Sequence, residues 1–147
     1  MEYRDTLQHL SPCGLDCVRC TDYEHGEIKH LSARLLDLLG KYSRVAKMRE
    51  ETEPAFANYH HFEQILGHFA GASCSGCRGG NVKCFIECAA VTCHREQGVD
   101  YCFQCGDYPC DKQFSGRMRE WWIRRNHRMK DIGVVGFYHE QRKQPRY

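Results

Sequence analysis

The chain has 147 residues and a net charge of +2, and Leu, Ile, Val and Phe make up about a fifth of it. This length is that of one ordinary domain, and the near-zero charge is unlike that of a disordered chain. With so few large apolar residues, the chain can bury little apolar surface when it folds. Eleven cysteines accompany it, which predicts a fold held by staples as well as by a core.

The N-terminal segment "MEYRDTLQHL" lacks the apolar stretch of a secretory signal. No apolar run approaches the ~20 residues that a membrane-spanning helix needs. We therefore expect a cytoplasmic protein without a membrane partner, in a compartment where thiols stay reduced. The odd number of cysteines also argues against a complete set of disulfides. Both observations favour metal thiolates.

The first thiol group lies in "CGLDCVRC", residues 13–20, where Cys13, Cys17 and Cys20 follow the spacing C-x3-C-x2-C. Three thiols leave a tetrahedral ion one ligand short. A cysteine of another group could complete the set, or a histidine near in the sequence: His9, His25, His30 or His94.

The fourth position could also stay open, because three thiols at this spacing hold a [4Fe–4S] cluster in radical-SAM enzymes. Those enzymes are built on a large barrel of strands and helices. This short chain shows no alternation of strands and helices, which argues against radical chemistry.

Residues 24–71 have helical periodicity. Apolar residues recur at helical spacing from Glu24 to Leu39, and Gly40 is a stop signal. A second helix is expected from Pro54 to Gly71, with a shorter one between the two. We interpret this segment as a helical layer between the first thiol group and the others. Its histidines have no thiol or carboxylate at ligand spacing and are expected to be solvated or in the core: His60, His61 and His68.

Residues 74–110 contain two sets of four cysteines. The first set is Cys74, Cys77, Cys84 and Cys88, and the second is Cys93, Cys102, Cys105 and Cys110. Four thiolates are what a structural zinc ion takes, and a C-x2-C pair lets one tight turn aim two sulfurs at the same ion. The spacing therefore predicts a zinc-knuckle region without regular structure.

The last segment, residues 111–147, is basic and predicts C-terminal helices. Phe114, Met118, Trp121, Met129 and Ile132 mark one helix face, which Arg125 interrupts. A shorter helix is expected from Val134 to Lys143, and the final "QPRY" is expected to fray.

Three interpretations of the basic helix stay open. Its arginines could bind nucleic acid, with Trp122 as a stacking surface. They could instead pack across the negatively charged metal sites, or they could simply face solvent. The low net charge argues against a dedicated nucleic-acid surface.

Several ordered motifs resemble the small Cys-rich prokaryotic family catalogued as domain of unknown function 3795. These are "CGLDCVRC", "CSGCR", "CFQCGDYPC" and the C-terminal "DIGVVGFYHEQRK". Thr21 stands where that family often has proline. The resemblance implies a zinc-binding or metal-binding protein without an assigned activity, and it places all eleven cysteines within matching segments.

The sequence thus predicts one α-rich, metal-stapled domain with helices, irregular Cys-rich loops and little or no sheet. We expect a zinc-binding structural or interaction protein with two to three Zn²⁺ ions, an unknown protein partner and an undetermined oligomeric state. The alternatives are an iron–sulfur redox or sensing protein with a [4Fe–4S] cluster at the first thiol group, and a nucleic-acid-binding zinc protein. An enzyme is less favoured, because no pairing singles out an acid or base among Asp16, Glu87, His94 and His25.

Overall fold

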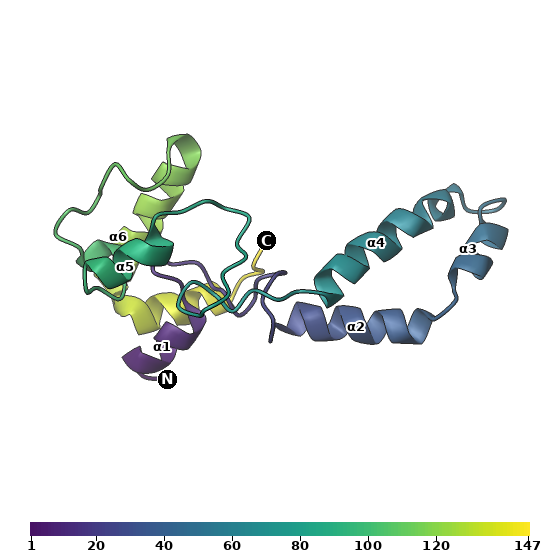
Figure 1. The fold of residues 1–147 in the computed structure, drawn as a ribbon, viewed down its shortest axis with the longest axis horizontal. Coiled ribbons are helices and arrows are strands. Elements are labelled where there is room, and N and C mark those ends of the chain that lie inside the picture. The colour runs from purple at the N-terminus through teal and green to yellow at the C-terminus, as the bar shows by residue number, and fades with distance from the viewer.

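The computed structural model describes residues 1–147 and places 55% of them in helices, with no β-structure beyond two isolated bridges. This confirms the predicted α-rich class with little or no sheet. Figure 1 shows two parts. We call residues 1–26 and 71–147 the cysteine lobe, because they contain every cysteine and both chain ends. We call residues 27–70, which project from it, the hairpin.

The hairpin contains α2 (Glu27–Leu39), α3 (Ser43–Arg49), the 3₁₀ helix η1 (Pro54–Asn58) and α4 (Tyr59–Ala70). The periodicity predicted these helices, and Gly40, at φ 51°, ends α2 as expected. The first helix begins at Glu27, three residues later than predicted. The reason is a tight turn, in which a Cβ on Gly26 would lie 3.1–3.3 Å from three backbone carbonyl oxygens.

The hairpin packs mainly on itself, α2 against α4. It extends away from the cysteine lobe (Figure 1) instead of forming a layer between thiol groups. Many of its large apolar side chains are consequently exposed, including Leu38 (66%), Met48 (76%) and Ile65 (56%).

The helices of the cysteine lobe are α1 (Tyr3–His9), α5 (Ala90–Glu96), the 3₁₀ turn η2 (Cys102–Gln104) and α6 (Gly116–Arg142). The main core of the lobe joins α1, η2 and α6, and its buried members are Leu10, Tyr101, Met129, Val134, Phe137 and Tyr138. A second cluster is centred on Cys13, Ala90 and Trp122. Helices α1 and α5 have seven residues each and were not predicted from the sequence.

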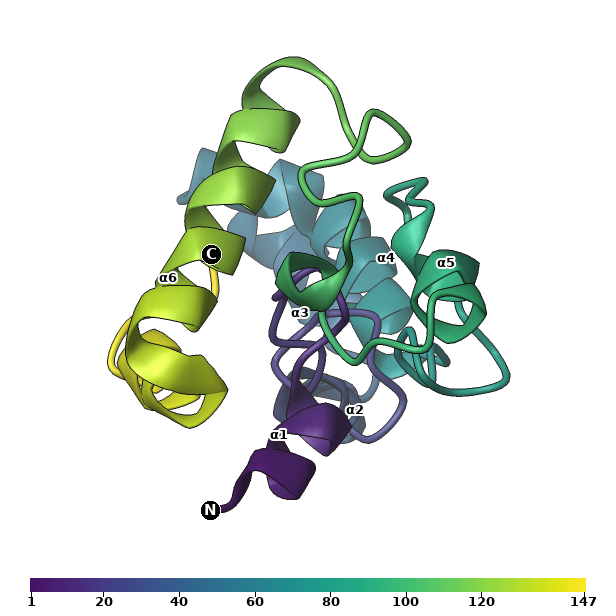
Figure 2. The same ribbon diagram turned by 90° about the vertical axis from the view of Figure 1, so that its left-hand side faces the viewer.

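Helix α6 has two limbs that meet at Gly133, whose φ of 75° and ψ of 155° are not helical. Figure 2 shows the first limb running along the lobe and the second turning aside at its base. This matches the expected pair of C-terminal helices. Trp122, which one of the open interpretations made a stacking surface, is fully buried and is not available to stack on a base.

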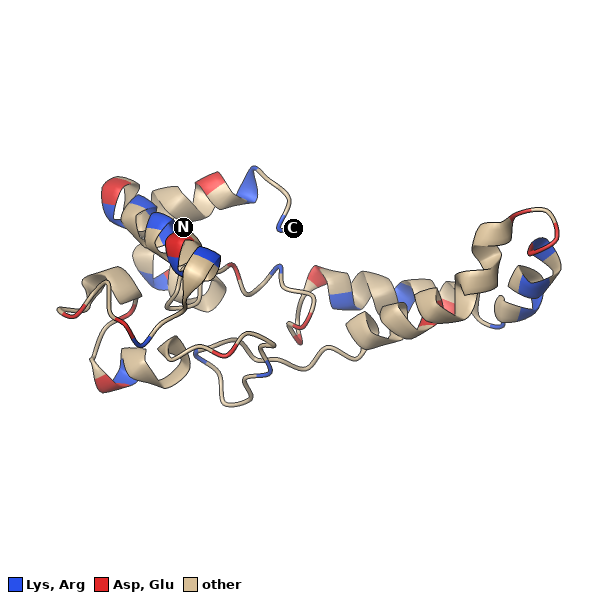
Figure 3. Cartoon of the chain, turned by 90° about the horizontal axis from the view of Figure 1, so that it is seen from above, with Lys and Arg blue, Asp and Glu red and all other residues tan.

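Charged residues of both signs are spread along the lobe and the hairpin (Figure 3). At the hairpin tip, the basic helix α3 is followed by an acidic loop that contains Glu50, Glu51 and Glu53. None of the helices combines the length and the apolar character needed to cross a membrane.

Candidate metal centre

Seven of the eleven cysteines line one cavity of about 460 Å³ in the cysteine lobe. They comprise the whole first group and the whole first set of the zinc-knuckle region: Cys13, Cys17, Cys20, Cys74, Cys77, Cys84 and Cys88. The structure therefore joins two groups that the sequence separated by more than fifty residues. We call this space the seven-cysteine cavity.

A short backbone pairing brings the two cysteine segments together. The Cys74 N–H donates to the Asp22 carbonyl (2.8 Å), and the Glu24 N–H donates to the Cys74 carbonyl (3.0 Å). Gly76, at φ 78°, then turns the chain beside Cys17, and a Cβ at this position would be in ordinary contact with the Cys17 Cβ at 3.7 Å. The hairpin thus leaves and re-enters the lobe at one point.

The "CG" of the first motif has a packing reason. Gly14 has a φ of 90°, and a Cβ there would lie 2.8 Å from the Cε of Met129. The positive φ favours glycine here, and a Cβ would also require the Met129 methyl group to move. The turn sets Cys13 facing Cys88, and the Cys13 Sγ lies 3.1 Å from the hydroxyl of Ser11.

The Cys13 and Cys88 thiols influence each other across the cavity, and so do those of Cys17 and Cys77. The hydrogen bond from Cys13 lowers the pKa of Cys88 to about 6, and the Gln113 amide, 2.9 Å from the Cys88 Sγ, acts in the same direction. The Cys77 thiol likewise lowers the pKa of Cys17 to about 7. The pKa values of the two donors, Cys13 and Cys77, are raised, mainly by that same hydrogen bond and secondly by burial.

Further donors point at the other sulfurs. The Lys83 N–H lies 3.2 Å from the Cys74 Sγ, and the Tyr147 hydroxyl lies 3.7 Å from the Cys20 Sγ. Donors of this kind around a sulfur help to orient it as a metal ligand.

The remaining four cysteines line a second, much smaller cavity of about 30 Å³: Cys93, Cys102, Cys105 and Cys110. This is the predicted second set, and we call its space the four-cysteine cavity. Burial raises the pKa of Cys102 to about 12. Trp122 lines the same cavity, and its indole nitrogen is buried without a hydrogen-bond partner.

All eleven thiols are free, and no three His, Cys, Asp or Glu side chains converge closely enough to hold an ion. The donor types nevertheless fit zinc, which is bound through cysteine thiolates. The unpaired Trp122 indole N–H and the hydrogen-bond donors around the sulfurs also fit zinc binding, because such donors stabilise the negative charge of metal-bound thiolates.

The four candidate histidine ligands lie in different places. His25 and His30 are exposed. His94 lines the four-cysteine cavity, with its Nδ1 2.6 Å from the Ala90 carbonyl oxygen. His9 lies beside Cys17 and Cys77 around a neighbouring cavity of about 220 Å³, and its Nδ1 is buried without a partner.

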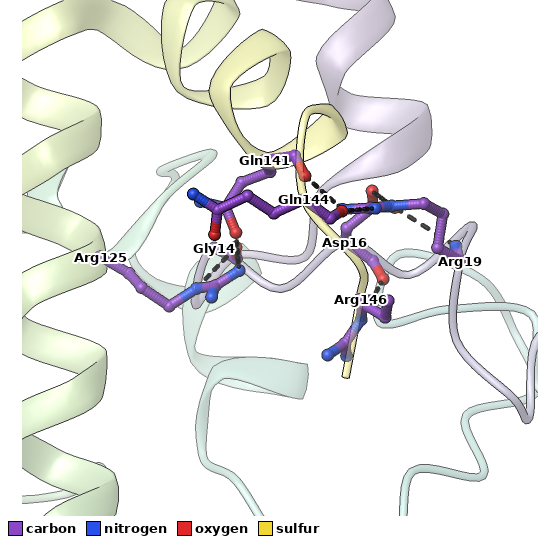
Figure 4. A network of polar contacts seen from close by, with 7 residues as sticks. All are labelled: Gly14, Asp16, Arg19, Arg125, Gln141, Gln144 and Arg146. Atoms are coloured by element: carbon purple, nitrogen blue, oxygen red, sulfur yellow. Dashed lines mark hydrogen bonds and ion pairs between the residues drawn. The ribbon is translucent and has the colours of Figure 1, made fainter.

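The C-terminal tail crosses the first cysteine segment, so the prediction that it frays is wrong. Arg19 donates to the Gln141 and Gln144 carbonyls (2.9 and 2.7 Å) and pairs with the buried Asp16 at 2.6 Å. The Arg146 Nε donates to the Asp16 carbonyl at 3.1 Å (Figure 4). Asp16, considered above as an acid or base, is thus part of an ion pair that holds this crossing.

Helix α6 contributes arginines to both the packing and the cavity. Arg125 donates to the Gly14 carbonyl at 3.1 Å and to the Gln141 side chain at 2.9 Å, and burial lowers its pKa to about 10 (Figure 4). Arg117 and Arg124 line the seven-cysteine cavity together with Trp121. No sequence signal singled out Gln113, Arg146 or Tyr147, because contacts of the tail with residues 13–21 depend on the tertiary fold.

The comparisons with known proteins agree with the motif resemblance. No curated protein and no solved structure matches the chain significantly. The sequence model of DUF3795, described as a protein of unknown function, matches residues 9–115. This range includes every cysteine and the whole hairpin, well over half of the chain, and the chain therefore belongs to the DUF3795 family of proteins of unknown function.

Proposed function

We propose that this protein is a zinc–thiolate protein with a structural or interaction role. The observation that carries the proposal is the sorting of all eleven cysteines around two cavities, four around one and seven around the other. The free energy of binding a zinc ion to four protein ligands is about 10–16 kcal/mol in small zinc-binding peptides, and it contributes directly to folding. Binding at these cavities would fix loops that have little regular structure of their own.

The small apolar core supports a stapling role. Only six buried residues form the main core of the lobe, and the second cluster has three. The segment from Ala72 to Ala89 contains no helix, and two of its four cysteines, Cys74 and Cys77, are buried. A long irregular segment of this kind gains little from periodic packing, so cross-links through its sulfurs would account for its order.

The exposed apolar side chains of the hairpin support the interaction role. Leu31, Leu38, Met48 and Ile65 are all more than half exposed. A groove of about 420 Å³ between the hairpin helices is lined by Tyr42, Phe56 and Phe62 among others. An apolar groove beside exposed apolar side chains is typical of protein-binding regions.

Iron–sulfur binding by the first thiol group is less well supported. Cys13 faces Cys88 and Cys17 faces Cys77, so the three thiols do not form a separate tripod. Nucleic-acid binding by α6 also has less support. Arg119, Arg125 and Arg128 hydrogen-bond within the protein, and Trp122 is buried.

Metal analysis of protein purified without oxygen tests the proposal. We expect a colourless protein with about two to three zinc ions per chain. Chelation in the presence of a reductant should remove the hydrogen-exchange protection of α5 and η2. The hairpin, which contains no cysteine, is the internal control, and α2 and α4 should keep their protection. A reduced, metal-free protein in which α5 stays protected would contradict the proposal, and a brown protein with iron and sulfide would favour the cluster.

A further inference from the structure

Helix α2 has an apolar stripe that the rest of the hairpin does not cover. The helix packs against α4, and its buried residue is Ser32. Leu31, Leu35 and Leu38 follow one another at steps of four and three residues, and all three are exposed. Residues at these steps lie on one side of a helix. Helix α2 therefore has a second apolar side, next to the side that packs against α4.

Helix α4 is built in the same way. Its buried residues are Tyr59 and Leu66, whereas Phe62 and Ile65, three residues apart, are exposed. Leu35 and Phe62 line the same groove of about 420 Å³, so the uncovered sides of the two helices lie on one face of the hairpin. We call this surface the open hairpin face, and its residues are Leu31, Leu35, Leu38, Phe62 and Ile65.

The open hairpin face has the pattern of one half of a four-helix bundle. A helix in a bundle has an apolar stripe wide enough to contact more than one neighbouring helix. The five side chains are between 39% and 66% exposed, and at roughly 100 Å² each they provide on the order of 500 Å² of apolar surface. This is the apolar share of a homodimer interface of about 800 Å² per partner. Two more helices of the same pattern would cover the face, and a second copy of this chain supplies both.

The charges at the hairpin tip favour a second copy over a partner of one charge sign. Lys41 and Arg44 follow α2, while Glu51 and Glu53 precede α4 (Figure 3). All four are exposed, and none of them forms an ion pair within the chain. A strongly acidic or strongly basic partner would be repelled by one of these two pairs. A two-fold axis parallel to the helices instead lays α2 over α4 of the second copy, so that the basic pair of each chain meets the acidic pair of the other.

We propose that the open hairpin face binds a second copy of this chain, and that the two hairpins form a four-helix bundle with their tips together. The inference rests on the proposed interaction role and names the partner. The hairpin projects from the cysteine lobe (Figure 1) and contains no cysteine. Dimer formation is therefore independent of the thiols and of any metal ion that they bind.

The mass of the reduced, full-length chain in solution tests the inference. Size-exclusion chromatography with light scattering should give twice the 17.2 kDa of one chain. Leu38→Glu should give the mass of a single chain, because the bundle would bury the new carboxylate without a partner. Its helix content should stay unchanged, since Leu38 is 66% exposed within one chain. His30→Glu is the matched control, because His30 is an exposed residue of α2 outside the open hairpin face, and this variant should remain a dimer.

A charge exchange at the tip tests the arrangement of the two copies. Replacing both Lys41 and Arg44 by Glu should raise the dissociation constant of the dimer by about tenfold, because four ion pairs become like-charge contacts. Replacing Glu51 and Glu53 by Lys in the same chain should restore it. A lack of restoration would show that the tips do not meet.

Two results overturn the inference: a wild-type chain that stays monomeric at about 100 μM, or a Leu38→Glu chain that stays a dimer, which would place the contact elsewhere. The zinc content of the same samples keeps the two proposals apart. A zinc-loaded monomer refutes the second copy as partner and leaves the zinc–thiolate proposal standing. A dimer without zinc supports the second copy and contradicts the zinc–thiolate proposal.

Discussion

Asn126 joins three parts of the cysteine lobe through one fully buried side chain. Its Oδ1 accepts the Phe103 N–H at 3.1 Å, and its Nδ2 donates to the Cys13 and Trp122 carbonyls at 3.2 and 2.9 Å. The amide thereby links α6 to the first cysteine of one cavity and to the η2 turn of the other. Buried polar groups of this kind are costly to leave unpaired.

Asn126→Ala should therefore lower the free energy of unfolding by about 2–4 kcal/mol, because the Phe103 N–H and the Cys13 carbonyl lose their partner in a dry site. Denaturant unfolding at fixed zinc concentration measures this. Lys130→Ala is the matched control on the same helix, exposed and without a hydrogen bond to lose, and should change stability by less than about 0.5 kcal/mol. Equal effects of the two substitutions would show that the Asn126 contacts contribute nothing.

The residue scale also shows where sequence patterns are informative. Cysteine spacing predicted the four-cysteine group of the second cavity, because short loops keep nearby thiols together. It did not predict that Cys13 faces Cys88 or that Trp122, rather than Trp121, is buried. Arginine and apolar residues alternate in the first limb of α6, so the sequence leaves its buried face ambiguous.

At the scale of elements, the two limbs of α6 depend on the backbone of Gly133. Its φ of 75° and ψ of 155° lie in a region that residues with a side chain avoid. The second limb returns Val134, Phe137 and Tyr138 to the core. The same limb leads into the tail that crosses the first cysteine segment.

Gly133→Ala should destabilise the protein by about 1–3 kcal/mol through backbone strain alone, since a Cβ there has open space around it. Gly136→Ala provides the comparison, because Gly136 is helical and its Cβ would make ordinary contacts with Ile132 at 3.7–3.8 Å. That substitution should be neutral or stabilise by up to about 1 kcal/mol. Thermal unfolding of both zinc-loaded variants would test the pair, and a Gly133→Ala protein as stable as the wild type would show that α6 can straighten.

Elements with a strong period were predicted closely and the others were not. The hairpin helices have apolar residues at helical spacing and glycine or proline at their ends, so α2 and α4 could be placed from the sequence. Helices α1 and α5 are short, and the loops around the cysteines follow no period. Their course depends on contacts distant in sequence, such as the pairing of Cys74 with Asp22 and Glu24.

At the scale of the whole molecule, the hairpin and the cysteine lobe are stabilised by different interactions. The main helix contacts of the hairpin are internal, α2 with α4 and α3 with η1, while those of the lobe join α1 and η2 to α6. The chain leaves and re-enters the lobe beside the bridge between Tyr23 and Cys74. One ion pair between the two parts, His68 with Asp22 at 3.4 Å, is mostly solvent-exposed on the histidine side and contributes little.

Replacing residues 27–70 by a short glycine–serine linker should therefore leave the cysteine lobe folded with its full metal content. No thiol is removed, and the two segments of the lobe that the linker would join already pair at the bridge between Tyr23 and Cys74. Zinc analysis and hydrogen exchange at α5 and α6 would measure this. The matched control is the Cys105→Ser chain with its hairpin intact, which should lose metal although its length is unchanged. If the shortened chain loses its zinc while Cys105→Ser keeps it, the hairpin is part of the metal-binding unit, and the division into two independently stabilised parts is incorrect.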